Sequence, residues 1–118
     1  VVAHAGLSDL VEIRVGSAEE QIPHLEDAFD VVFIDHWKDD YLSDLKLLEA
    51  EGMLRPGACI VADNVGIFST ALQPYLKYVR ESDHFQSTHY ATGMEYNHAI
   101  DDGVEVSIWQ PDQAEMAA

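Results

Sequence analysis

The chain divides into segments whose hydrophobic residues repeat with the period of a strand or of a helix. Residues 11–15 alternate apolar and polar side chains, as a half-exposed edge strand does, and Gly16 ends this pattern. Residues 30–34 and 58–62 are continuous apolar runs of strand length. Such runs are typical of parallel strands covered by helices, so we expect both faces of these two strands to be buried.

Apolar residues spaced three and four apart predict helices between and after these strands. The first helix would span residues 19–28 with Ile22, Leu25 and Phe29, the second carries Leu42, Leu45 and Leu48, and the third carries Leu72, Leu76 and Val79. Gly52 is a suitable stop for the second helix. Pro74 is tolerable only in the first turn of the third helix, which therefore begins near it.

Two further segments, residues 84–91 and 104–109, are rich in β-branched and aromatic residues. Turn signals lie between them at Gly93 and at residues 101–103, so the two segments predict an antiparallel pair. The predicted order is strand, helix, strand, helix, strand, helix, strand, strand. This order predicts an α/β fold with a mostly parallel sheet, right-handed crossovers and a closing antiparallel hairpin.

The length of 118 residues allows one small domain. We place it at residues 1–110 and expect a disordered tail at residues 111–118. No stretch approaches the roughly 20 apolar residues of a membrane span, and the first residues lack the features of a secretory signal. The lone Cys59 cannot form an internal disulfide and fits a reducing compartment, which favours the cytoplasm.

The charge is strongly negative, because 22 acidic residues stand against 6 basic ones and give a formal net charge of -16. Nucleic acids and anionic membranes would be repelled unless a basic patch compensated. We therefore expect neither of them as a partner. The acidity is that of a solvated surface, or else of a protein from a salt-rich source.

Oxygen-bearing side chains follow both apolar runs at the point where each run stops. Asp35 follows the first run, and Asp63 and Asn64 follow the second. Ligands of open α/β sheets bind at the carboxyl ends of strands, and hard oxygen ligands suit Mg²⁺. Either aspartate alone could equally cap the next helix. The occurrence of both together with Asn64 favours a metal site.

Three side chains next to Asp35 add candidate chemistry. Lys38 lies one helical turn beyond Asp35, and a metal ion there would lower the pKa of its ammonium and make it a usable general base. Most lysines, however, are solvated surface charges. His36 and Trp37 are flat side chains at a strand end and could line a binding site for a planar ligand. Ordinary packing accounts for their presence equally well.

Motifs along most of the chain resemble the catechol O-methyltransferase family. They are Asp35-His36-Trp37-Lys38-Asp39, Tyr41-Leu42, Leu47-Leu48-Glu49, Gly52-Met53-Leu54, Ala62-Asp63-Asn64-Val65, Ser87-Thr88-His89-Tyr90 and Met94-Glu95-Tyr96. The resemblance runs from Ala5 to Trp109. The run at residues 35–39 is much more specific than a general methyltransferase pattern.

The resemblance implies magnesium-dependent transfer of a methyl group from S-adenosylmethionine (SAM) to one hydroxyl of a catechol. By similarity, Asp35, Asp63 and Asn64 hold the metal, and Lys38 accepts the proton of the attacking hydroxyl. The implied substrate contacts are Lys38, Asn64, Glu95, Trp37 and Met94, with Glu95 bonded to the second hydroxyl. The implied cofactor contacts are Gly16, Ser17, Ala18, Glu19, Asp35, His36 and Trp37.

Three positions depart from the family pattern. Ala18 stands where a serine hydroxyl is expected, which weakens the expected hydrogen bonds to adenine. Asp40 stands where the animal enzymes have an arginine. Residues 66–68, Gly-Ile-Phe, replace a proline-bearing loop that shapes the catechol pocket. Substrate preference is therefore expected to differ.

The resemblance covers only the carboxyl-terminal part of a Rossmann-like methyltransferase sheet, with the first two strands missing. The family's glycine-rich loop and its ribose-binding acidic residue have no counterpart here. Residues 30–35 would then form an apolar, unpaired edge that invites the missing amino-terminal half or a second copy of the chain. Val1 in place of methionine also fits a fragment. We expect these 118 residues alone not to bind SAM tightly.

Two classes of function follow. The first is the metal and substrate half of a catechol methyltransferase. The second is an inactive remnant that serves as a metal-binding or interaction module. A third possibility, a phenolic methyltransferase for larger substrates, is disfavoured by the run His36-Trp37-Lys38.

Overall fold

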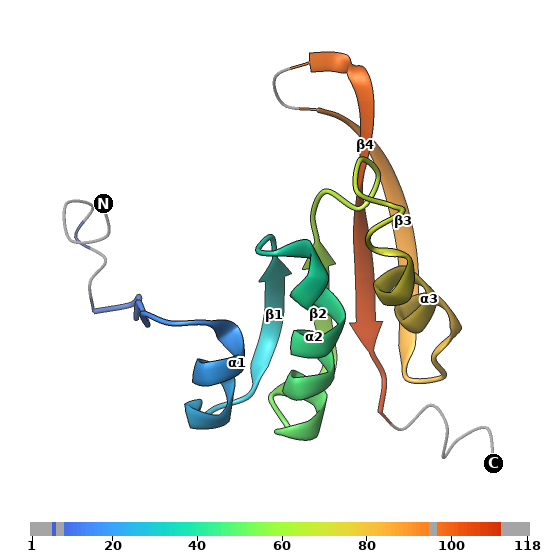
Figure 1. The fold of residues 1–118 in the computed structure, drawn as a ribbon. Coiled ribbons are helices and arrows are strands. Elements are labelled where there is room, and N and C mark those ends of the chain that lie inside the picture. Colours follow the sequence, from blue (N-terminus) through green and yellow to red (C-terminus); the bar gives the residue numbers. More distant parts are fainter. Residues whose placement is uncertain (1–5, 7–8, 95–96, 112–118) are drawn as a thin grey trace.

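A mixed four-stranded sheet with its helices on one face forms the body of the molecule (Figure 1). The computed structural model describes residues 6, 9–94 and 97–111. The elements are α1 (Ala18–Gln21), the 3-10 helix η1 (Ile22–His24), β1 (Phe29–Ile34), the 3-10 helix η2 (Lys38–Asp40), α2 (Tyr41–Ala50), β2 (Leu54–Ala62), α3 (Gln73–Glu81), β3 (Phe85–Met94) and β4 (Asn97–Trp109). The predicted α/β class with a closing antiparallel hairpin is confirmed.

The sheet has the order β1-β2-β4-β3. Strands β1 and β2 are parallel and are joined by a crossover through α2, whereas β4 is antiparallel to both β2 and β3. Ile34 lies opposite Ala62 at the ends of β1 and β2, and the Asp63 N–H donates to the Ile34 carbonyl at 3.0 Å. The chain segments that follow these two strands therefore begin side by side.

The hydrophobic core lies between the helices and the sheet face that they cover. Leu45 and Leu48 of α2 and Leu76 and Val79 of α3 are buried in it, as the predicted spacing requires. The sheet contributes residues of alternate positions, namely Ile34, Ala58, Ile60 and Ala62. Pro74 lies in the first turn of α3, where its missing N–H costs no helical hydrogen bond.

The opposite face of β1 is open, contrary to the prediction that both of its faces are buried. Val31 and Phe33 expose 65% and 63% of their surface. Their apolar neighbours on β2, Cys59 and Val61, are only partly buried. β1 is also the edge strand of the sheet. The face of β1 that carries Val31 and Phe33 therefore has no cover within the described part of the chain.

Three predicted elements differ from the structure. Residues 11–15 form no strand and are exposed, because no described strand lies beside them to complete their hydrogen bonds. The helix predicted over residues 19–28 is reduced to α1 and η1, in which Pro23 occupies the start of a separate 3-10 turn. Residues 101–103 are not a turn but part of β4. The predicted tail, residues 111–118, lies outside the described residues except for residue 111.

Among the described residues, no helix is long and apolar enough to cross a membrane.

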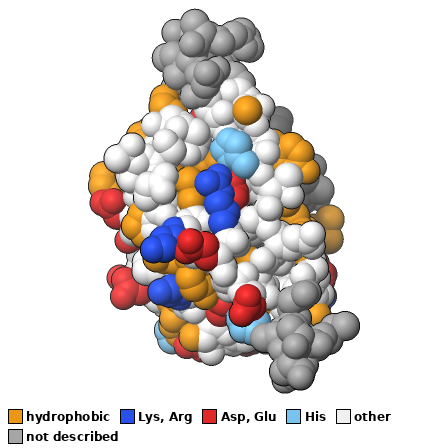
Figure 2. All heavy atoms as spheres, turned by 90° about the vertical axis from the view of Figure 1, so that its right-hand side faces the viewer, with side chains coloured by type: hydrophobic (Ala, Val, Ile, Leu, Met, Phe, Trp, Pro, Cys, Tyr) orange, Lys and Arg blue, Asp and Glu red, His pale blue; other side chains and the backbone are white. Residues whose placement is uncertain are grey.

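A buried carboxylate joins helix α3 to the hairpin of β3 and β4. Figure 2 shows Lys and Arg side chains gathered near acidic ones on the face at the right of Figure 1. Glu105 of β4 is only 1% exposed, and both of its oxygens accept hydrogen bonds from Arg80 of α3, at 2.8 and 2.9 Å. His89 of β3 contacts the same carboxylate at 3.1 Å. A bidentate guanidinium pair of this kind compensates a buried charge well.

The substitution Arg80→Met should lower the free energy of unfolding by about 2–3 kcal/mol, because it leaves the buried Glu105 carboxylate without its main partner. Arg55→Met is the matched control, since Arg55 pairs with Asp30 at 2.9 Å but both side chains are more than half exposed. It should cost less than about 1 kcal/mol. Urea unfolding of the two variants measures the difference, and equal costs would contradict the assignment.

The same pair predicts a pH dependence. Burial alone would raise the pKa of the Glu105 carboxyl, but the hydrogen bonds and charges of Arg80 and His89 outweigh it and hold that pKa below its ordinary 4.5. A group with a lowered folded-state pKa stabilises the fold above its unfolded pKa, and this stability is lost as pH falls through the folded value. The cost of Arg80→Met should therefore shrink below about pH 4.5. An unchanged cost in urea unfolding at about pH 3.5 would contradict this.

Candidate active site

Oxygen atoms at the ends of the two parallel strands converge on one lysine. The Nζ atom of Lys38 donates to Oδ1 of Asp35 and to Oδ1 of Asn64, at 3.3 Å in each case. Asp35 directly follows β1, and Asn64 lies two residues beyond β2. Lys38 begins the 3-10 turn η2 between β1 and α2. In this position its side chain reaches the residues that follow the two strands. The arrangement places a cation between the two predicted ligand oxygens.

The hydroxyl of Tyr41 links this lysine to the end of β2. Its hydroxyl accepts a hydrogen bond from Lys38 Nζ at 2.8 Å and donates to the Asp63 carbonyl at 3.0 Å. The Tyr41 side chain is fully buried, and Lys38 Nζ lies 4.9 Å from its ring centre and 5.4 Å from that of Phe68. Tyr41 begins α2 and was part of the motif, but sequence alone assigned it no role. Its position one turn after Lys38 was the available signal.

The pKa of Lys38 is raised in the protein by itself. Burial lowers it, but the hydrogen bonds and charges of Tyr41 and Asp35 outweigh burial and favour the ammonium form. The lowered pKa predicted from the sequence assumed a metal ion beside the lysine. In the structure, Tyr41 and the Asp35 carboxylate favour the ammonium, so the shift of the Lys38 pKa runs in the opposite direction.

The predicted metal ligands have the chemistry of a hard-cation site. Asp63 Oδ1 accepts the N–H of Asn64 at 2.8 Å, and Asn64 has a φ of 61°, a left-handed conformation that few residues other than glycine adopt. Such conformations are kept where the surrounding structure requires them, often at functional sites. No group of three or more His, Cys, Asp or Glu comes together in the described part of the chain. Two carboxylates and one amide suit Mg²⁺ or Ca²⁺ better than zinc.

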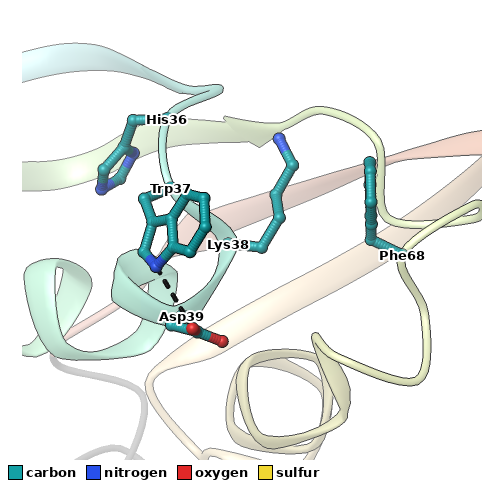
Figure 3. Close-up of a pocket in the computed structure, with 5 residues that line it drawn as sticks. All are labelled: His36, Trp37, Lys38, Asp39 and Phe68. Carbon is teal, nitrogen blue, oxygen red and sulfur yellow. Dashed lines mark hydrogen bonds between the residues drawn. The ribbon is translucent and has the colours of Figure 1, made fainter.

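A cavity of about 320 Å³ opens beside Lys38 (Figure 3). Its lining consists of His36, Trp37, Lys38, Asp39 and Phe68. The rings of Trp37 and Phe68 stand on opposite sides of the lysine in Figure 3, and the Trp37 N–H donates to Asp39 at 3.2 Å. Phe68 lies in the loop that departs from the family pattern. Its ring and that of Trp37 would contact a flat ligand on either side of the Lys38 amine.

A second cavity of about 310 Å³ lies on the other side of His36 and Trp37. Its lining consists of Gly16, Ser17, Ala18, Glu19, His36, Trp37, Asp40 and Asp44. The structure therefore gathers the predicted cofactor contacts in one place, except Asp35. His36 is held there by Asp44, 2.6 Å from its Nε2, and by stacking on Tyr41 with ring centres 5.4 Å apart.

Two predicted substrate contacts cannot be placed, because Glu95 and the side chain of Met94 lie outside the described residues. Conversely, sequence reasoning missed Asp102, which it assigned to a turn. The Asp102 carboxylate accepts from the Asn64 side-chain amide at 2.9 Å. In the sequence, the only available signal was the pair Asp102-Gly103, an acceptor side chain next to a glycine. Nothing in this pair indicated a contact with Asn64.

Comparison with known proteins gives one family-model match and several similar proteins. Residues 1–65 match the family described as a methyltransferase domain. The chain is 44% identical over 111 residues to "Catechol O-methyltransferase" of Mus musculus and 41% identical over 114 residues to "Catechol O-methyltransferase B" of Danio rerio. These matches cover 90% and 92% of this chain but 41% and 42% of the relatives. The chain thus spans about two fifths of their length.

The fold is also similar to that of solved O-methyltransferases. The structure of the O-methyltransferase TomG from Streptomyces achromogenes, which is in complex with SAM, superposes with a TM-score of 0.78 at 25% identity. The match covers 92% of this chain and 54% of TomG. The Rossmann-like methyltransferase fold predicted from the sequence is therefore confirmed for the part present here.

Replacing Tyr41 by Phe should lower the free energy of unfolding by about 1–2 kcal/mol, because the Asp63 carbonyl and Lys38 lose a buried partner. Tyr90→Phe is the matched control, since Tyr90 is 55% exposed and its hydroxyl can bond to water. It should change stability by less than about 0.5 kcal/mol. Urea unfolding compares the two variants, and a neutral Tyr41→Phe would show that the hydroxyl does not hold the site together.

Proposed function

This chain belongs to the methyltransferase domain family and is a homologue of catechol O-methyltransferases, and from that premise we propose its function. It carries the metal and substrate half of an enzyme that transfers a methyl group from SAM to a catechol hydroxyl in the presence of Mg²⁺. The observation that carries the proposal is the convergence of Asp35 and Asn64 on Lys38 at 3.3 Å. A site that holds an ammonium between two oxygens offers the same oxygens to a metal ion.

The proposed metal ligands are Asp35, Asp63 and Asn64. A bound Mg²⁺ would supply positive charge that favours the ionised form of a nearby hydroxyl. Lys38 would accept the proton of the attacking hydroxyl, since its amine lies at these oxygens and borders the apolar cavity. Glu95 would accept a hydrogen bond from the second hydroxyl. Trp37, Met94 and Asn64 would complete the substrate contacts.

The second cavity is the proposed site for part of SAM. Gly16, Ser17, Ala18 and Glu19 line one side, and His36 and Trp37 line the other. Ala18 offers no hydroxyl, so adenine would rely on backbone groups and on contact with the two flat rings. Asp35, a proposed metal ligand, directly precedes His36 and Trp37 in the sequence and is the remaining proposed cofactor contact.

Methyl transfer by direct attack requires no covalent bond to the enzyme. The chain would therefore act mainly by holding the hydroxyl oxygen and the methyl group in line and by stabilising charge. The rings of Trp37 and Phe68 on either side of Lys38 would restrict a flat substrate to one plane. Because Phe68 replaces the family's proline-bearing loop, the preferred catechol would differ from that of the animal enzymes.

The open sheet face marks the proposed partner. Val31 and Phe33 are mostly exposed on the edge strand β1, and an exposed apolar edge favours association. We assign this surface to the amino-terminal half of a methyltransferase fold, since this chain covers 41% of the mouse relative. A second copy of the chain is the alternative occupant.

Charge and composition define the remaining partners. The net charge of -16 fits a small-molecule substrate and disfavours nucleic acid or an anionic membrane as partner. The lone Cys59 fits a cytoplasmic location.

Methyl transfer from labelled SAM to catechol with Mg²⁺ tests the proposal. The 118-residue chain would be assayed alone and together with the amino-terminal part of the mouse relative. We expect no turnover alone and turnover from the combined halves, because only together do they complete the SAM site. In the combined sample, Lys38→Met should reduce the rate at least about 100-fold by removing the general base.

Lys77→Met is the matched control, because Lys77 is an exposed lysine on α3. It should leave the rate unchanged. Turnover by the chain alone would contradict the division into halves. Binding of the two halves without turnover would instead support the inactive interaction module.

A further inference from the structure

A buried aspartate lies behind the proposed metal ligand Asn64 and is assigned no role by the proposed function. Asp102 belongs to β4 and is only 6% exposed. It lies 38 positions beyond Asn64 in the sequence, yet the two side chains are hydrogen-bonded at 2.9 Å. A buried carboxylate needs several hydrogen bonds to offset the loss of water. Its partners therefore show what it does.

The two oxygens of Asp102 have separate partners. Oδ1 accepts three backbone N–H groups, those of Gly66 at 3.1 Å, Ile67 at 3.0 Å and Gly103 at 2.8 Å. Oδ2 accepts the side-chain amide of Asn64 at 2.9 Å. One oxygen thus fixes the loop after β2, and the other is directed at a single side-chain group.

The backbone of the loop after β2 lies in close contact with the backbone of β4. A Cβ atom at Gly66 would lie 2.4 Å from the Asp102 carbonyl carbon and 2.6 Å from the Gly103 nitrogen. The N–H of Val65 also donates to the Gly103 carbonyl at 3.1 Å. These contacts fix the backbone of Asp102 beside the loop, and the three N–H groups bonded to Oδ1 then hold its carboxylate next to the Asn64 amide.

An asparagine amide has an oxygen that accepts and a nitrogen that only donates, and the two are similar in shape. A carboxylate only accepts, so Asp102 selects the orientation in which the Asn64 nitrogen faces β4. The Asn64 oxygen must then face the opposite way, and it does: it lies 3.3 Å from the Lys38 ammonium. The rotated amide would place its NH₂ donors against the cation site.

We propose that Asp102 is a positioning residue that fixes the Asn64 amide with its oxygen toward the cation site. The inference rests on the proposed function, in which Asn64 is a metal ligand. Asp102 does not itself contact the metal or the substrate. Partners of this kind, bonded to a ligand rather than to the metal, typically change metal affinity about 10–100-fold when replaced.

The variant Asp102→Asn tests the orientation with little change of shape. The three backbone donors would hold the new carboxamide oxygen at the position of Oδ1, which places its NH₂ group against the NH₂ group of Asn64. The Asn64 amide would have to rotate and present its nitrogen to the cation. Binding of Mn²⁺ alone to the 118-residue chain, followed by the electron paramagnetic resonance signal of free Mn²⁺, should weaken about 10–100-fold.

The double variant Asp102→Asn with Asn64→Asp is the decisive comparison. It reverses donor and acceptor, so the new carboxamide at position 102 would donate to one oxygen of the new carboxylate at position 64, while the other oxygen of that carboxylate faces the cation. Mn²⁺ affinity should then be at least about tenfold higher than in the single variant.

Asp83→Asn is the matched control, because it removes the same charge from an exposed residue at the opposite end of β3. It should leave the affinity unchanged.

Side-chain amide hydrogen exchange supplies a readout that needs no metal and no variant. In wild type, the Asn64 NH₂ hydrogen bonded to Asp102 should exchange at least about tenfold more slowly than those of the exposed Gln73 side chain. Equal exchange would overturn the inference, as would a double variant that binds Mn²⁺ no better than Asp102→Asn. Slow exchange together with no Mn²⁺ binding by wild type would contradict the proposed metal site while leaving the orientation of Asn64 by Asp102 supported.

Discussion

The parallel pairing of β1 with β2 is the constraint on which the site depends. Its register places Ile34 opposite Ala62, so the residues that follow the two strands emerge together at one edge of the sheet. A shift of one residue would turn every side chain of β1 to the other face and would move Asp35 away from Asn64. The cation site is thus a consequence of strand register rather than of either loop alone.

Tyr41 connects this edge to the rest of the fold. It is fully buried, holds Lys38 and the Asp63 carbonyl with one hydroxyl, and stacks its ring on His36. Lys38 borders one cavity, and His36 borders both. A single buried ring at the start of α2 therefore sets the relative positions of the two proposed binding cavities. The sequence named His36 and Lys38 as candidate site residues but gave Tyr41 no role, so it did not show how the two cavities are linked.

The sequence predicted the parts of the fold in which one physical signal dominates. The spacing of Leu45 and Leu48 and the position of Pro74 placed α2 and α3 correctly. The acidic ends of the apolar runs predicted Asp35 and Asn64, which the structure brings to the same lysine. The sequence failed where tertiary contacts decide. Asp102 has the local appearance of a turn residue, but the hairpin extends through it because its carboxylate is satisfied by a loop 35 to 38 positions away. No local pattern records such a contact.

The wrong prediction for β1 is the most informative one. Val31 and Phe33 carry the hydrophobic pattern of a strand covered on both faces, yet they are exposed on an edge. A pattern of this kind reflects the surroundings in which the chain is stable, because exposed apolar residues at an edge favour association. The described residues bury one face of the strand and leave the other open. The difference between the pattern and the burial therefore points, independently of any comparison with relatives, to the same surface that the proposed function assigns to a partner.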